Sequence, residues 1–164
     1  MSAPSRALAA AAVVLALVAG CYVSPYSIGT ADDAKVDRAF VGDWEGIDGE
    51  KLRLVIRNFN NREYYVEWKD GRGDNNRLSG FVTDVRGVKI ANLREISDDG
   101  SIKDEYLLMR VELKDDQLTL RHFNESFFES KTIESAEDLR KIVEQNLESE
   151  EMYAEQGVLR RVKS

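Results

Sequence analysis

LLMRVELKDDQLTLR, residues 107–121, is the stretch that decides the fold. Its apolar side chains alternate with more polar ones on both sides of Asp115-Asp116: Leu107, Met109, Val111 and Leu113 come before this pair, and Leu118 and Leu120 come after it. A period of two places alternate side chains on one face of a β-strand. Two such strands joined by a short acidic turn are typical of an antiparallel hairpin with one buried face.

The same alternation continues outward from this hairpin. Leu52, Leu54 and Ile56 form one alternating set, and Tyr64, Val66 and Trp68 form another. Turn signals separate the sets at even spacing: Asp48-Gly49, Asn60-Asn61, 71–76, Arg86-Gly87, 98–100 and Asp115-Asp116. No proline follows Pro25, so none interrupts a strand. The rhythm predicts a mainly β protein: an antiparallel meander of seven strands forming a small barrel or half-barrel, with an eighth strand near 158–162.

A helical pattern interrupts the strands near the C-terminus. Ser135 is a candidate N-cap, and Leu139, Ile142, Val143 and Leu147 then fall on one helical stripe. We expect one amphipathic helix over about 135–148. We expect its stripe to pack on the sheet or across one opening of the barrel, ahead of the last strand.

The first 21 residues resemble the signal segment and lipobox of bacterial lipoprotein precursors. Residues 7–18 are an uncharged apolar run, and Leu17-Val18-Ala19-Gly20-Cys21 closes it. The resemblance implies a signal peptide over 1–20, cleavage after Gly20 and lipid attached to the Cys21 sulfur. Several acyl chains would then hold the protein on a membrane, because one chain alone gives only marginal binding. Tyr22 stands where such precursors commonly carry Asp for inner-membrane retention, so the resemblance implies the periplasmic face of the outer membrane in a Gram-negative host.

Length and charge bound the mature chain. The precursor has 164 residues and a net charge of −7, which becomes about −8 once Arg6 leaves with the signal. We expect residues 21–35, rich in Ser, Pro, Gly and Asp, to be a lipidated tether, and 36–164 to be a single β-rich domain. The acidic balance argues against nucleic acid as a partner, because nucleic acid rewards a basic patch.

The start of the domain carries a second resemblance. Gly42-Asp43-Trp44 is similar to the Gly-x-Trp opening of lipocalin-like barrels. In that family the Trp plugs the closed end of the barrel and an Arg from a late strand packs over it. The resemblance implies that Arg121, Arg160 or Arg161 takes that part here.

The residues that could carry chemistry are few. Cys21 is the only cysteine and His122 the only histidine, so the sequence predicts neither a disulfide nor a metal site, and it indicates no cofactor and no catalytic residue. His122 could act as an acid or base with Glu125 nearby, but no nucleophile accompanies it. Residues 72–74 spell Arg-Gly-Asp within a turn-rich loop, and the pairs 98–99 and 115–116 lack the ligand spacing of a calcium loop.

Three classes of function stay open at this point. A lipid-anchored, non-catalytic binding module for an apolar small molecule or an envelope protein is the first hypothesis, and a structural or assembly accessory of an envelope complex is the second. An enzyme is disfavoured. A cavity of about 300 Å³ or more inside the barrel would favour the binding module, whereas a barrel filled by side chains would favour the accessory.

Overall fold

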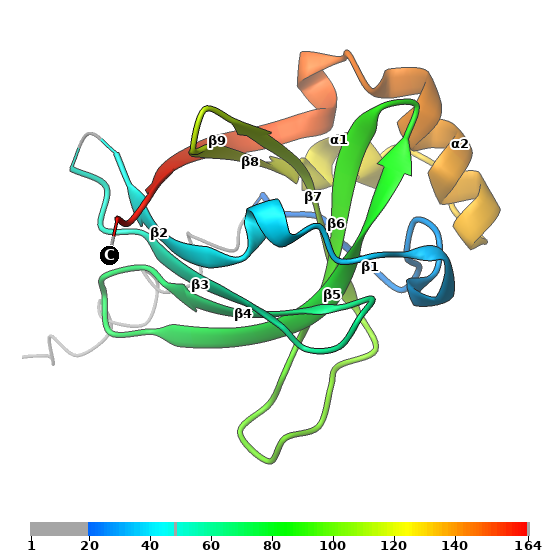
Figure 1. The fold of residues 1–164 in the computed structure, drawn as a ribbon. Helices are drawn as coiled ribbons and strands as arrows, with labels where there is room; N and C mark the ends of the chain where they lie inside the picture. Colours follow the sequence, from blue (N-terminus) through cyan, green and yellow to red (C-terminus); the bar gives the residue numbers. More distant parts are fainter. Residues whose placement is uncertain (1–19, 48, 164) are drawn as a thin grey trace, which may run out of the picture.

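The computed structural model describes residues 20–47 and 49–163 and shows a β-barrel with helices packed on its outside (Figure 1). The barrel strands are β2 (Gly42–Gly46), β3 (Arg53–Asn58), β4 (Tyr64–Lys69), β5 (Asn75–Val85), β6 (Val88–Glu95), β7 (Tyr106–Lys114), β8 (Gln117–Phe123) and β9 (Tyr153–Arg161). The other elements are β1 (Val23–Ser24), α1 (Glu125–Glu129), α2 (Ala136–Asn146) and the 3-10 turns η2 (Ala31–Asp33), η3 (Arg38–Phe40) and η4 (Glu150–Met152).

Sequential pairing of neighbouring strands closes the barrel. β2 to β9 pair antiparallel in chain order, and β9 then pairs with β2, so the meander joins its own first strand. The hairpin at 107–121 is the β7–β8 pair, in which Val111 faces Leu120 and Leu113 faces Leu118. The predicted antiparallel barrel of about eight strands, with a helix before the last one, is confirmed. β1 is an additional short strand that pairs with β7.

Side chains fill the barrel interior. The alternating apolar residues named from the sequence point inward, where Trp44, Met109, Leu118 and Leu159 have at most 1% of their surface exposed. A chamber wide enough to hold water beside these side chains would leave part of their surface accessible. The interior is therefore a packed core, as in other barrels of about eight strands, whose interior is just wide enough for side chains to fill.

A second apolar cluster lies between the barrel wall and the helices. Leu139, Val143 and Leu147 of the helical stripe are buried there, against outward-facing residues such as Ile90 and Leu108. α2 thus packs on the outer face of the sheet (Figure 1). Ser135 caps it as expected, with its Oγ accepting a hydrogen bond from the Asp138 N–H at 3.1 Å. Ile142 is only half-buried at the edge of the cluster, because it lies beside the buried stripe and not at its centre.

The segment expected to be a flexible tether is instead bound to the barrel. Ile28 is fully buried in the outer cluster, and its N–H donates to the Asn92 side chain at 2.7 Å. Ser24 is also buried, within β1. The expectation of a free coil over 21–35 was therefore wrong. A few apolar side chains and one buried amide partner fix a stretch whose composition alone is typical of coil.

Candidate functional site

An open pocket of about 430 Å³, here called the side pocket, lies beside the barrel wall. It exists because neighbouring strands differ in length. The β4–β5 ladder ends at the pair Tyr64 and Gly80, whereas β5 continues to Val85 in its pairing with β6. Residues 81–85 therefore have no β4 partner, and the N-terminal segment passes across this gap (Figure 1).

Close contact between the N-terminal segment and β5 forms one wall of the side pocket. The Thr83 hydroxyl donates to the Ile28 carbonyl at 2.6 Å. Gly29 has φ of +81°, and a Cβ placed on it would lie 2.8 Å from the Thr83 Oγ1. A larger residue at position 29 would be strained and would clash, so glycine lets this wall approach the strand.

The floor of the side pocket is apolar. Phe40, Tyr64 and Val82 line it, and the Phe40 and Tyr64 rings meet edge to face with centroids 6.3 Å apart. The Tyr64 hydroxyl accepts a hydrogen bond from the Asp37 N–H at 2.6 Å, which ties the N-terminal segment to β4. Burial raises the pKa of the Tyr64 phenol above its ordinary value, so the hydroxyl stays protonated at neutral pH.

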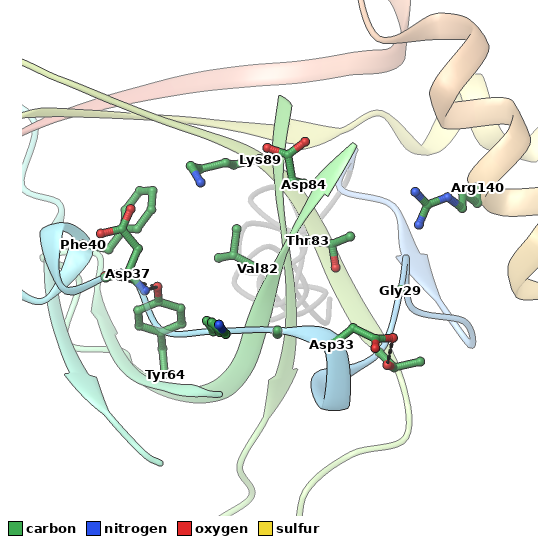
Figure 2. A pocket seen from close by; sticks show the side chains of 13 residues that line it. Gly29, Asp33, Asp37, Phe40, Tyr64, Val82, Thr83, Asp84, Lys89 and Arg140 are labelled. Atoms are coloured by element: carbon green, nitrogen blue, oxygen red, sulfur yellow. Dashed lines mark hydrogen bonds between the residues drawn. The ribbon is translucent and has the colours of Figure 1, made fainter. Parts of the chain in front are cut away.

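Charges of both signs surround this floor. Three carboxylates and three cations line the pocket: Asp33, Asp37, Asp84, Lys35, Lys89 and Arg140. Figure 2 shows Lys89 extending from β6 toward Phe40, while Arg140 reaches in from α2 on the opposite side. Arg140 is held by Glu144, with its Nε 2.9 Å from the carboxylate.

Lys89 is the cation that a ligand would meet at the floor. It is half-buried and lies across the β5–β6 ladder from Asp84. The ion pairs of the described residues do not include it. An ammonium beside apolar side chains attracts an anionic group more strongly than one in open water, because fewer water molecules screen it. The side pocket can therefore hold a small amphipathic molecule.

A second hollow, of about 530 Å³, lies on the outer face of β7, β8 and β9 and is here called the charged groove. Arg110 and Arg121 stand opposite each other on β7 and β8, with the Tyr153 ring beneath both. Arg121 pairs with Glu150 at 2.5 Å, and Arg110 donates to the Leu147 carbonyl at 3.3 Å. These contacts attach the chain after α2 to the barrel, so they are structural.

One end of the barrel, here called the Trp44 end, is tightly closed. The Arg161 guanidinium lies 4.3 Å from the centre of the Trp44 ring and donates to the carbonyls of Ala39 and Val41. The Trp44 indole N–H donates to the Phe40 carbonyl at 3.0 Å. Of the three candidate arginines, Arg161 is therefore the one that packs over Trp44. Arg160 instead pairs with Glu45, and Arg121 belongs to the charged groove.

His122 faces the barrel interior at the other end, where its ring centre is 5.6 Å from that of Trp68. Its Nδ1 is buried and has no hydrogen-bond partner among the described residues. Burial lowers the pKa of His122 below its ordinary value, while Glu155 acts in the opposite direction. Glu125 is exposed at the start of α1. Among the described residues, no nucleophile is hydrogen-bonded to His122.

Cys21, the predicted lipid attachment site, is the second of the described residues, which begin at Gly20. It forms an isolated antiparallel bridge with Asn124, directly after β8. Burial raises the pKa of its thiol, and the carboxylates of Glu155 and Glu125 add to this effect. The predicted signal peptide falls mainly on residues 1–19, which are outside the described part of the chain.

The remaining motifs lie on exposed turns. Residues 72–74 are in the loop between β4 and β5, where the Arg72 N–H donates to Asp70 in ordinary turn geometry. The acidic pair 98–99 lies in the loop after β6, and 115–116 forms the turn between β7 and β8. Within residues 20–47 and 49–163 there is no cluster of three or more side chains that could hold a metal ion.

Comparison with known proteins adds no relative. No family model, curated protein or solved structure matches this chain. In the part of the chain that the structure describes, no helix is long and apolar enough to cross a membrane.

Sequence reasoning missed the side pocket. Phe40, Tyr64 and Val82 look like core residues in the sequence, and Lys89 looks like an ordinary surface lysine. The turn signals gave no hint of it, because they leave segments of equal length, 62–70 and 77–85, on either side of 71–76. The difference in length between β4 and β5 appears only in the structure.

Proposed function

We propose that this protein is a lipid-anchored, non-catalytic binding protein of the bacterial envelope, held through Cys21, and that its ligand binds in the side pocket. The observation that carries the proposal is the open pocket of about 430 Å³ beside the barrel. Ligand sites are usually at least about 300 Å³ and combine apolar walls with a few polar groups. The side pocket exceeds this volume and combines an apolar floor with six charged side chains.

The charges suggest the class of ligand. An apolar part of the ligand would contact Phe40 and Val82, and an anionic group would pair with Lys89. The three carboxylates that line the pocket could pair with a cationic group on the same molecule. We therefore infer a small amphipathic ligand with at least one negative charge.

Native mass spectrometry of protein purified from its host tests the pocket. Wild-type protein should carry a bound small molecule, and Lys89→Glu should release it, since the substitution puts a fourth carboxylate in the pocket. Lys114→Glu is the matched control, because Lys114 lines the charged groove and not the side pocket. Equal occupancy of the wild type and both variants would contradict the assignment.

The anchor has its own test. Cys21→Ala should abolish metabolic labelling with a radioactive fatty acid and move the protein from the membrane fraction to the soluble fraction. Membrane retention of the variant with an unchanged acylated mass would overturn the lipid anchor.

An accessory role in an envelope complex is the second candidate. The filled barrel favours it, because a packed interior leaves only the outer surface for function. In that case cross-linking in cells should capture one specific protein partner, and Lys89→Glu should leave that partner unaffected.

A further inference from the structure

The chain directly after Cys21 is bound to the barrel from Tyr22 onward. The Tyr22 N–H donates to the Phe123 carbonyl at 2.8 Å, and the Tyr22 ring stacks on Phe128 with centroids 4.4 Å apart. β1 then pairs with β7, and Ile28 is buried. A lipid on Cys21 is therefore attached to the barrel itself, without an intervening flexible segment.

Strand alternation shows on which side Cys21 lies. Val23 pairs with Leu107, and paired residues in neighbouring strands point to the same face of a sheet. Leu107 packs against the barrel core, whereas Tyr22 packs in the outer cluster. Cys21 is two residues before Val23, so its side chain lies on the same side as Val23, toward the barrel axis.

This side belongs to the less tightly packed end of the barrel, here called the Trp68 end. Its inward-facing residues, Leu52, Trp68, Leu107 and His122, are all partly exposed, in contrast to the sealed Trp44 end. Val23, with 41% of its surface exposed, lies beside Leu107 at this end. The connection from β6 to β7 emerges at the same end and carries Ile102, which is 37% exposed.

We propose that the Trp68 end rests directly on the bilayer surface, with Val23 and Ile102 in contact with lipid and the Trp44 end pointing away. This inference rests on the proposed lipid anchor at Cys21. Acyl chains that leave from the rim of this end hold it against the membrane, because the chain between anchor and barrel is too short to let the domain turn over. Glu125 and Glu155 near Cys21 favour a neutral lipid surface over an anionic one.

Fluorescence quenching in vesicles tests this orientation. In the lipidated protein the Cys21 sulfur is blocked, so an introduced cysteine is the single free thiol and accepts one fluorophore. Ile102→Cys places the label at the Trp68 end, and Phe59→Cys places it in the β3–β4 turn near the opposite end, at a residue that is 56% exposed. The purified lipidated proteins are reconstituted in phosphatidylcholine vesicles with and without quencher groups on the acyl chains.

Quencher lipids should reduce the Ile102→Cys signal several-fold more than the Phe59→Cys signal. An insertion of 15 Gly and Ser residues between Cys21 and Tyr22 provides the matched control, because it adds roughly 20 Å of average reach and should remove the difference. Equal quenching at both positions without the insertion would overturn the orientation. The acylated mass of each sample distinguishes failure of the anchor from failure of the orientation. An unacylated Cys21 would contradict the lipid anchor itself, whereas acylated protein with equal quenching would contradict only the orientation.

Discussion

The Arg161 side chain joins three separate parts of the fold. Its guanidinium covers the Trp44 ring, donates to two carbonyls in the segment before β2, and pairs with Asp116 in the β7–β8 turn. The last strand, the first barrel strand and a distant turn therefore meet at one group. Removing that group leaves several polar atoms without partners.

We expect Arg161→Ala to lower the free energy of unfolding by about 2–3 kcal/mol, because hydrogen bonds to a charged group contribute about 1.5–3 kcal/mol and the cation–π contact adds to them. Arg160→Ala is the control, since Arg160 is exposed and its ion pair with Glu45 should contribute less than about 1 kcal/mol. Urea unfolding followed by tryptophan fluorescence measures both. Equal losses in the two variants would show that Arg161 does not close the Trp44 end.

His122 gives the fold a dependence on pH. Burial holds its pKa in the folded protein below the ordinary value of 6.5, so the unfolded chain takes up a proton at a higher pH than the folded protein does. His122 therefore has no effect on stability well above pH 6.5. Stability falls as the pH drops from there through the folded pKa, and the loss is complete below it.

We expect the wild type to lose more stability than His122→Gln between pH 7 and pH 5. Glu155, the carboxylate that acts on His122, opposes this effect but is the smaller cause. Urea unfolding at each pH gives the free energy of unfolding of both proteins. The difference between the two pH profiles reports the imidazole alone, because the carboxylates titrate in both proteins. Parallel pH profiles would mean that His122 is solvated in the folded state.

At the scale of elements, α2 depends on burial for its stability. A helix of 11 residues is marginal alone in water, so its buried residues, fixed on the outer face of the sheet, must stabilise it. Val143 is fully buried at the centre of this contact, whereas Ile142 lies at its edge.

We expect Val143→Asp to destabilise the protein by at least about 3 kcal/mol, since it removes a buried apolar side chain and buries a carboxylate without a partner. Ile142→Asp should cost less, and Gln145→Asp on the exposed face should have little effect. Thermal unfolding monitored by circular dichroism gives the melting temperatures of the three variants, which should rise from Val143→Asp through Ile142→Asp to Gln145→Asp. A melting temperature for Val143→Asp equal to that of Gln145→Asp would exclude the packed position of α2.

For the whole molecule, the consequence of the fold is that residues 21–35 belong to the folded unit. They supply β1, the buried Ile28 and one wall of the side pocket. A boundary at residue 36, which the composition suggested, would cut through this structure. Cys21 and the side pocket are thus linked by one continuous segment of chain.

We expect a variant that begins at residue 36 to melt well below one that begins at Tyr22, because it exposes the apolar surface that Ile28 and Tyr22 cover. Burial of one large apolar side chain contributes about 1.5–3 kcal/mol, so the loss of both should amount to several kcal/mol. Differential scanning calorimetry of the two purified variants measures it. Equal melting temperatures would restore the view of 21–35 as a tether.

The sequence by itself determined the antiparallel meander, its strand count and the helix before the last strand. Alternation within each strand and acidic turns between strands are local signals. In the hairpin at 107–121, the turn at Asp115-Asp116 and the Leu118-Thr119-Leu120 alternation after it together set the register of the two strands. The motif at Cys21 is local too, and the lipid attachment that it implies stays a prediction. The sequence also named three arginines for Trp44 but could not choose between them.

Only the tertiary structure decided which arginine covers Trp44, whether the barrel is filled, and where residues 21–35 lie. Each of these depends on contacts between residues far apart in the chain, such as Ile28 with Asn92 and Arg161 with Ala39. Inward-facing Leu and Trp can line a cavity or fill it, and the barrel's closure alone sets the space they share. The side pocket also depends on contacts between distant residues, because it forms where β5 extends beyond the end of β4 and the N-terminal segment crosses the gap.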